Sequence, residues 1–301
     1  MQKELMSFLE NKLNQLANYG FKMIDEKPIN YGIQIKLEKK NQNIPVNIYF
    51  SKKKGISVVI GGSPKDFLRP DLERIFDKSP KEYILEHEWN SWIGSDESGK
   101  GDFFGPLIVA GFYAERKIIP YLQQIGVQDS KKMSDKDIEQ TGKRLYAAYF
   151  DQIKVITMLP EKYNQRYAEM KTKRKNLNDL LAWMHSRIIV DLHDKYHPNG
   201  VLIDKFTYDG RMRASLKAMQ EINFMAKTKA ESDPFVAAAS IIARFHLNRW
   251  FTRVSGELDF KLPKGSGSLV YKAAQELVHK IGKEKLNSYA KLHFKNYERI
   301  K

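Results

Sequence analysis

The 301-residue sequence contains no cysteine. This absence excludes a disulfide framework, catalysis by a thiol, and zinc or iron–sulfur sites that need cysteine ligands. No apolar run reaches the roughly 18 residues that a membrane-spanning helix needs, so we expect no association with a membrane. The N-terminal stretch MQKELMSFLENKL has acidic residues and helical spacing, unlike a signal peptide. We therefore expect a cytoplasmic protein.

Positive charge is what the sequence has in excess. It contains 51 Lys and Arg against 36 Asp and Glu, a formal net charge of +15. Such an excess favours a polyanionic partner, most often nucleic acid. Hydrophobic residues make up 42% and charged residues 29%, which is typical of a globular chain. The length suggests two domains.

Residues 1–80 are expected to form a small α/β domain. Apolar residues at helical spacing predict a helix over 2–18, and three apolar runs predict strands at 33–37, 46–50 and 57–60. A short helix over about 64–78 completes the unit. The charged, aperiodic stretch 81–90 reads as a linker.

Residues 91–301 are expected to form a second, larger domain. Strands are predicted at 91–96, 107–113 and 153–159, followed by an amphipathic helix over 177–196. Further strands are predicted at 201–204 and 224–228, and a helix is predicted from Pro234. Strands first and strand–helix–strand alternation afterwards indicate an α/β fold, a mixed sheet with flanking helices.

Two adjacent carboxylates, Asp96 and Glu97, end the first predicted strand of this domain and are followed by glycines. Adjacent side chains point to opposite faces of a strand unless a turn redirects one of them. Paired carboxylates in a basic protein could hold divalent cations against phosphates. A solvated turn is the alternative.

Two more acids lie where later strands end. Asp204 closes the strand 201–204, and ligands of α/β sheets gather at the carboxyl ends of strands, although an acid there can also start a loop. Asp233 precedes Pro234, a pattern typical of an N-cap followed by the first helical residue. Glu231 lies two residues earlier and needs another explanation.

Two other motifs suggest different chemistry. Gly94–Lys100 fits the phosphate-loop pattern G-x-x-x-x-G-K, but Gly101 replaces the Ser or Thr that binds magnesium, and two acids would lie inside the anion cradle. His193 and His197 have zinc-ligand spacing on a helix, but Asp194 stands where the zinc-protease pattern has Glu. A non-catalytic nucleic-acid binder is the competing class for the whole chain.

Five segments resemble motifs of the type 2 ribonucleases H, in the order of that family. They are Ile93–Gly101 (IGSDESGKG) with Gly105–Pro106, Asp129–Ser134 (DSKKMS), Val201–Asp204 (VLID), Lys229–Ser232 (KAES) with Ala237–Arg244 (AAASIIAR), and Ala290–Asn296 (AKLHFKN). Within the family, Lys100 and Glu231 resemble the HIII branch, because HII members have Arg and Asp at these positions.

The resemblance implies an RNase H-like fold and endonucleolytic cleavage of the RNA strand of RNA–DNA hybrids. By this resemblance Asp96, Glu97, Asp204 and Glu231 would hold two divalent ions, usually Mg²⁺ with Mn²⁺ as a possible substitute. Glu231 is preferred to Asp233 as the fourth ligand, because it matches the K-A-[DE]-S pattern. The N-terminal unit would be a substrate-binding domain similar to the TATA-binding protein fold.

Substrate contacts are expected at two of these motifs. The backbone of Gly99, Lys100 and Gly101 could approach the 2′-hydroxyl groups that mark RNA, because glycines permit close approach. Contacts are also expected from Ser130, Lys131 and Lys132, although any single lysine could belong to a solvated face. We expect the partner to be an RNA–DNA hybrid, with no obligate protein partner, and the chain to be a monomer.

Overall fold

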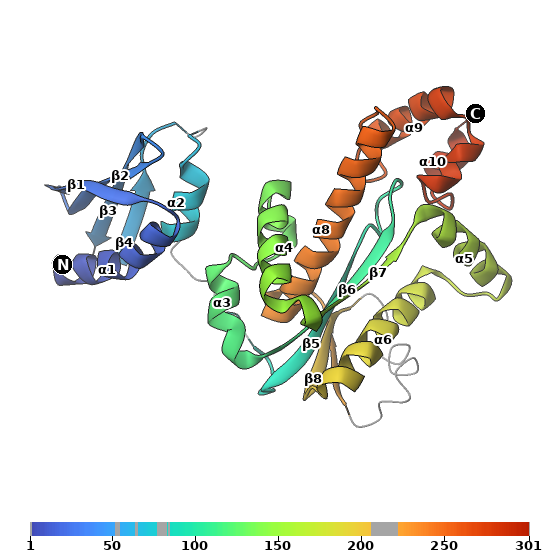
Figure 1. Cartoon of the computed structure of the whole chain (residues 1–301), viewed down its shortest axis with the longest axis horizontal. Coiled ribbons are helices and arrows are strands. Elements are labelled where there is room, and N and C mark those ends of the chain that lie inside the picture. Colours follow the sequence, from blue (N-terminus) through green and yellow to red (C-terminus); the bar gives the residue numbers. More distant parts are fainter. Residues whose placement is uncertain are drawn as a thin grey trace. The chain divides into compact units, whose positions relative to one another are not determined.

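The chain folds into two compact units, Met1–Glu82 and Tyr83–Lys301. The computed structural model describes residues 2–51, 55–63, 66–76, 83, 85–205 and 222–300. Figure 1 shows the elements of both units along the chain.

The first unit is a four-stranded antiparallel sheet with two helices against it. Strands β1 (Lys22–Ile29), β2 (Gly32–Lys39), β3 (Gln42–Ser51) and β4 (Gly55–Ile60) pair in sequence order. Alternate residues of β2 and β3 point into a core that also contains apolar residues of α1 (Gln2–Asn18) and α2 (Arg69–Phe76). The strand period of two thus buries one sheet face under the helices.

Strand β1 was not predicted from the sequence. Seven of its eight residues are exposed, so it shows no alternation of apolar and polar residues. It nevertheless pairs with β2 through its backbone, from Lys22 opposite Glu38 to Ile29 opposite Gly32. The likeness of this unit to the TATA-binding protein fold remains a prediction.

The second unit contains a mixed five-stranded sheet, as expected. Its strands are β5 (Ser91–Ser98), β6 (Leu107–Glu115), β7 (Ile153–Met158), β8 (Gly200–Asp204) and β9 (Asn223–Lys227), in the order β7-β6-β5-β8-β9. The pairs β5–β6 and β6–β7 are antiparallel, whereas β8 runs parallel to β5 and β9 parallel to β8. The carboxyl ends of β5 and β8 therefore lie side by side at one edge.

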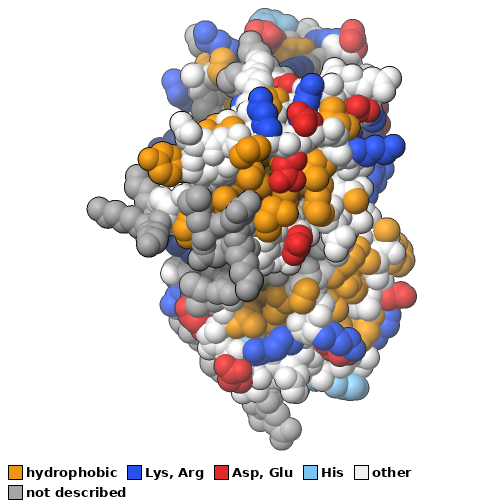
Figure 2. All heavy atoms as spheres, turned by 90° about the vertical axis from the view of Figure 1, so that its left-hand side faces the viewer, with side chains coloured by type: hydrophobic (Ala, Val, Ile, Leu, Met, Phe, Trp, Pro, Cys, Tyr) orange, Lys and Arg blue, Asp and Glu red, His pale blue; other side chains and the backbone are white. Residues whose placement is uncertain are grey.

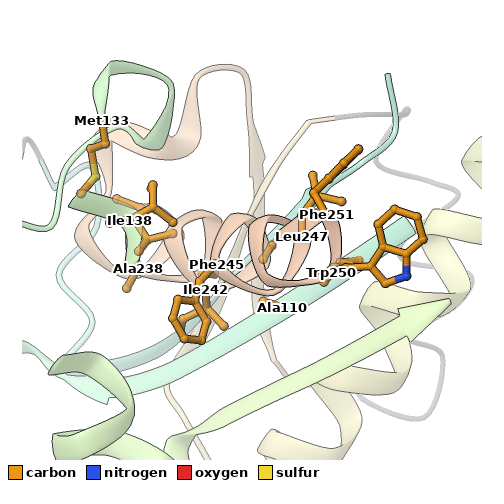
Figure 3. Close-up of a cluster of buried hydrophobic side chains, with 14 of the residues drawn as sticks. Ala110, Met133, Ile138, Ala238, Ile242, Phe245, Leu247, Trp250 and Phe251 are labelled. Atoms are coloured by element: carbon orange, nitrogen blue, oxygen red, sulfur yellow. The ribbon is translucent and has the colours of Figure 1, made fainter. Parts of the chain in front are cut away.

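Helices cover both faces of this sheet. The long helix α8 (Pro234–Glu257) packs on one face with α3 (Ile119–Gln124) and α4 (Asp135–Tyr149), and α6 (Leu177–Tyr196) packs on the other with α5 (Pro160–Thr172). Helices α9 (Ser268–Ile281) and α10 (Lys295–Arg299) follow. Figure 3 shows α8 residues Ala238, Ile242 and Phe245 with Ala110 of β6 and Ile138 of α4.

A glycine lets α8 lie directly on β5. A Cβ atom on Gly94 would lie 2.2 Å from the Phe235 carbonyl carbon and 2.3 Å from the Val236 nitrogen. On either side of this contact, Trp92 and Asp96 share the α8 face of β5, because side chains alternate along a strand. Ile93 and Ser95 face α6.

The end of the expected linker packs against the second unit. His87 stacks on Trp89, with ring centroids 4.1 Å apart, and meets the edge of Trp92. The Arg116 guanidinium donates to the carbonyls of His87 at 2.7 Å and Trp89 at 3.0 Å. Residues 87–89 are thus held by aromatic stacking and by Arg116, which neither charge nor periodicity along the segment indicates.

The described part of the chain contains no helix long and apolar enough to cross a membrane. On the face drawn in Figure 2, Lys and Arg side chains are interspersed with Asp and Glu side chains. Among the described residues on that face, basic side chains are therefore scattered between acidic ones.

Candidate active site

Asp96 lies on the α8 face of β5, where a helix residue supports its carboxylate. The Ser240 hydroxyl of α8 hydrogen-bonds to this carboxylate, and the Glu97 backbone N–H donates to Oδ1 at 2.8 Å. The Ser240 hydroxyl is also 2.8 Å from the Ser130 hydroxyl. One end of the motif DSKKMS is thereby tied to the same helix as Asp96.

Glu97 lies on the opposite face, toward α6. Its Oε2 is 3.3 Å from His185 Nε2, and its Oε1 is 3.5 Å from Lys100 Nζ. The two adjacent carboxylates therefore point to opposite faces of the strand, as its period of two requires. Strand β5 continues to Ser98, two residues beyond the predicted end, so Gly94–Ser98 forms a strand and not a phosphate loop.

Asp204 and Glu231 come from neighbouring segments at the same edge of the sheet. Asp204 ends β8, and its Oδ1 accepts a hydrogen bond of 3.1 Å from the Ala230 N–H. Ala230 begins a 3₁₀ turn over Ala230–Ser232, after Lys229 in a left-handed conformation with φ of 58°. This turn carries Glu231, whose Oε1 lies 3.3 Å from Lys131 Nζ.

The electrostatics show that the carboxylates share one region. Burial and the negative charge of Glu97 raise the pKa of Asp96, and Asp204 adds to this effect. Burial also opposes ionisation of Glu97, but the hydrogen bond from His185 and the charge of Lys100 outweigh it, so its pKa is lowered. Desolvation opposes the charge on Lys131, yet Glu231, Asp96 and Asp204 raise its pKa. The Lys131 ammonium therefore lies in the field of three carboxylates.

Among the residues that the structure describes, no three His, Asp or Glu side chains lie close enough together to hold a metal ion. Asp96 and Glu97 point to opposite faces of β5, which keeps these two carboxylates apart. The atoms that these four acids could offer to a metal ion are all carboxylate oxygens. They fit hard divalent ions such as Mg²⁺ and Mn²⁺ and do not favour zinc.

Asp233 is fully occupied in capping α8. It is 4% exposed, and its Oδ1 accepts from Phe235 N at 2.9 Å, Val236 N at 3.1 Å and Trp92 Nε1 at 3.1 Å. Its Oδ2 lies 3.4 Å from His87 Nε2. These contacts hold Asp233 in the helix cap, whereas the Glu231 carboxylate contacts Lys131.

The residues expected to contact substrate differ in their exposure to solvent. Gly101 is exposed, and a Cβ built there would meet no atom within 4 Å. Gly99 is buried, whereas the Lys131 and Lys132 side chains are 75% and 63% exposed. Ser130 is 5% exposed and its hydroxyl is paired with Ser240, so this hydroxyl is turned inward.

The alternative zinc motif lies elsewhere, at the end of α6. The rings of His193 and His197 have centroids 5.8 Å apart. His193 Nδ1 is 3.5 Å from the exposed Asp194 carboxylate. The described residues provide no group of three ligands here either.

Sequence reasoning missed two residues that support the acids, His185 and Ser240. His185 interrupts the apolar face of the helix 177–196, and Ser240 interrupts a run of alanines and isoleucines. A polar residue on an otherwise buried face is a signal that could have drawn attention to both.

The sequence is similar to named ribonucleases. The family model described as ribonuclease HII matches residues 93–297. Ribonuclease HIII of Protochlamydia amoebophila is 41% identical over 209 residues, which cover 69% of this chain and 67% of that protein. Ribonuclease HIII of Bacillus thuringiensis subsp. konkukian is 39% identical over 216 residues, covering 69% of this chain and 68% of that protein.

Solved structures agree with this similarity. Bst-RNase HIII in complex with Mn²⁺ matches with a TM-score of 0.62 and 26% identity, over 96% of this chain and 94% of that chain. Aquifex aeolicus RNase H3 matches with a TM-score of 0.54 and 25% identity, over 95% and 96% of the two chains. The expected fold and family are both confirmed. The chain belongs to the ribonuclease HII family of type 2 ribonucleases H, whose members cleave the RNA strand of RNA–DNA hybrids, and its sequence and fold are similar to those of ribonucleases HIII.

Proposed function

We propose that this endoribonuclease hydrolyses the RNA strand of hybrids with divalent ions held by Asp96, Glu97, Asp204 and Glu231. The observation that supports this assignment most is the Lys131 ammonium, which is within 3.3 Å of Glu231 and in the field of Asp96 and Asp204. A cation is thus already stabilised by three of these four acids. We propose two ions, with Mg²⁺ as the usual metal and Mn²⁺ as a substitute.

In this proposal the four acids bind the ions, and Lys131 has a different role. Bound divalent ions would activate a water molecule and stabilise the leaving oxygen. Asp96 and Glu97 contribute oxygens from the two faces of β5, whereas Asp204 and Glu231 contribute them from the adjacent strand end and turn. Lys131 offsets the mutual repulsion of the acids. Once divalent ions neutralise these acids, its exposed side chain would be available to contact a phosphate.

Replacing Asp96 tests this assignment. Asp96→Asn removes the ionisable carboxylate but keeps an acceptor for the Glu97 N–H. We expect cleavage of a labelled RNA–DNA hybrid to fall about 1,000-fold or more, which corresponds to about 4 kcal/mol of barrier, because metal ions contribute several kcal/mol. Binding of the hybrid should be retained.

The assay runs the hybrid beside single-stranded RNA and duplex DNA, with Mg²⁺ or Mn²⁺. Asp194→Asn is the matched control, because it makes the same substitution at an exposed site on α6. Near wild-type cleavage by Asp96→Asn would contradict the assignment of the site. Binding of all three substrates without metal-dependent cleavage would favour the non-catalytic alternative.

We further propose that the chain acts as a cytoplasmic monomer. In the second unit, the residues proposed to contact the hybrid are Gly99, Lys100, Gly101, Lys131 and Lys132. The first unit, Met1–Glu82, is proposed to be a substrate-binding domain. Polar and basic side chains on the outward face of β2 and β3 support binding there. Gln34 and Asn47 are hydrogen-bonded across β2 and β3 at 2.6 Å, and Lys36 lies on the same face as Gln34. The basic run Lys52, Lys53 and Lys54, from which the sequence also suggests a contribution to hybrid binding, lies outside the described residues.

A further inference from the structure

A buried histidine connects the Glu97 carboxylate to the interior of the second unit. His185 is 0% exposed and lies in the middle of α6, among the residues that pack on the sheet. Its Nδ1 is 2.8 Å from Ser95 Oγ and its Nε2 is 3.3 Å from Glu97 Oε2. Ser95 and Glu97 are two residues apart on β5, so one imidazole spans successive positions on the same face of the strand.

The available donors and acceptors show that His185 donates the hydrogen bond to Glu97. An ionised carboxylate can only accept, so Nε2 must carry a proton to bond with it. The Ser95 hydroxyl has one proton and two acceptors at 2.8 Å, His185 Nδ1 and the Ala110 carbonyl. The Ser95 hydroxyl can donate its proton either to His185 Nδ1 or to the Ala110 carbonyl. In both cases His185 donates from Nε2 to Glu97.

We propose that His185 is a positioning residue, which holds one oxygen of Glu97 on the α6 side so that the carboxylate is oriented for a divalent ion. This inference rests on the proposed function, because it requires Glu97 to be a metal ligand. The Glu97 side chain is 11% exposed, and His185 contacts it from the buried side. Partners of this kind fix the orientation of metal-ligating carboxylates, and their removal costs about 10–100-fold in metal affinity.

Three substitutions of His185 separate its two contacts. His185→Met keeps a similar volume but has no N–H donor. His185→Asn places an amide near the position of Nδ1, within reach of Ser95, whereas His185→Gln places one near Nε2, within reach of Glu97. We expect Mn²⁺ affinity to fall about 10–100-fold in the Met and Asn variants and to recover substantially in the Gln variant.

The measurement is Mn²⁺ binding to the full-length protein without substrate, from the electron paramagnetic resonance signal of free Mn²⁺. Tryptophan fluorescence of the metal-free protein checks folding, since all four tryptophans, Trp89, Trp92, Trp183 and Trp250, belong to the second unit. Ser95→Ala is a milder variant that removes the contact to Nδ1. It should weaken Mn²⁺ binding less than His185→Met and serves if the latter does not fold.

A double-mutant cycle with Glu97→Gln gives the deciding result. If His185 acts through Glu97, His185→Met should have no further effect on Mn²⁺ affinity in the Glu97→Gln background. Wild-type affinity in His185→Met, equal recovery by Asn and Gln, or an undiminished effect in the Glu97→Gln background would each overturn the inference. If Glu97→Gln itself binds Mn²⁺ like the wild type, the proposed metal site fails as well.

Discussion

Lys291 carries an amine into the interior of the second unit. It is 1% exposed, and its Nζ donates to the Gly105 carbonyl at 2.5 Å and lies 3.5 Å from the Phe104 carbonyl. Burial lowers its pKa to about 7, although Asp102 opposes the shift. A neutral amine can still donate both hydrogen bonds, so the residue can serve this structural role without its charge.

This burial predicts a pH dependence of stability. The pKa of Lys291 is about 7 in the folded state against an ordinary 10.5, so between these values the unfolded chain binds more protons than the folded chain. The free energy of unfolding should therefore rise with pH across this window, with a slope of at most about 1.4 kcal/mol per pH unit from this group. Lys291→Met should flatten that rise.

Denaturant unfolding followed by tryptophan fluorescence measures this slope, because it reports on the second unit alone. Lys272→Met, which changes an exposed lysine of α9, controls for the removal of one charge. An equally steep rise in Lys291→Met and wild type would show that Lys291 does not cause it.

The four acids proposed for the site could be picked out from the sequence, whereas the side chains that contact them could not. Asp96, Glu97, Asp204 and Glu231 lie next to strand ends, and that signal is local. His185 meets Glu97 across 88 residues of sequence, so the contact depends on how α6 docks on the sheet. No local pattern determines that docking.

At the scale of elements, the turn after β5 contains two glycines with different constraints. Gly99 has a φ of +87°, and a Cβ there would lie 2.1 Å from the Pro106 carbonyl oxygen. Gly101 has open space around it. The first glycine is required by the fold, and the second is free for another role.

Alanine at each glycine separates these roles. Gly99→Ala should lower the free energy of unfolding by about 1–3 kcal/mol, because the added methyl group clashes with backbone in a left-handed conformation. Gly101→Ala should leave stability unchanged but weaken hybrid binding if the substrate backbone approaches there. Denaturant unfolding and hybrid titration measure the two effects. Reduced stability in Gly101→Ala, or unchanged hybrid affinity in the same variant, would contradict this division.

Elements with a strong period were predicted well. The helix 177–196 has an apolar face, interrupted at His185, and matches α6 in full, and the Asp233–Pro234 cap gave the start of α8. The end of β5 was predicted two residues early, because glycine suggests a turn while pairing with β6 continues to Ser98 opposite Ile108. Backbone pairing, which the sequence does not display, determined that boundary and the existence of β1.

At the scale of the whole molecule, deletion of residues 1–82 tests the proposed role of the first unit. Tyr83 is kept, because its hydroxyl donates to the Val127 carbonyl at 2.7 Å within the second unit. We expect weaker hybrid binding and a shallower dependence of log affinity on log salt, by about 0.7–0.9 for each phosphate that the truncated chain no longer neutralises.

A salt titration of hybrid binding by the full chain and the truncated chain measures both quantities. Fluorescence-monitored unfolding confirms that the second unit remains folded after truncation. Equal affinities at every salt concentration would exclude a substrate-binding role for the first unit and favour a protein-interaction module.

The division into two units was expected from length and composition, but the detail of the boundary was not. The segment 85–90 is charged and aperiodic, yet His87 and Trp89 stack beside Trp92, and His87 approaches Asp233. Aromatic stacking of this kind produces no periodic pattern in the sequence. Composition alone therefore assigned this segment to the linker.

Because Asp96 and Glu97 point to opposite faces of β5, the geometry of the proposed catalytic edge depends on how α8, β5 and α6 are spaced. Ser240 on one helix contacts one carboxylate and His185 on another contacts its neighbour, with β5 between them. A core substitution that shifts either helix by a fraction of an ångström changes the distance between the two carboxylates without touching either. Folded variants with impaired catalysis should therefore occur far from the acids, in the packing of α6 and α8 on the sheet.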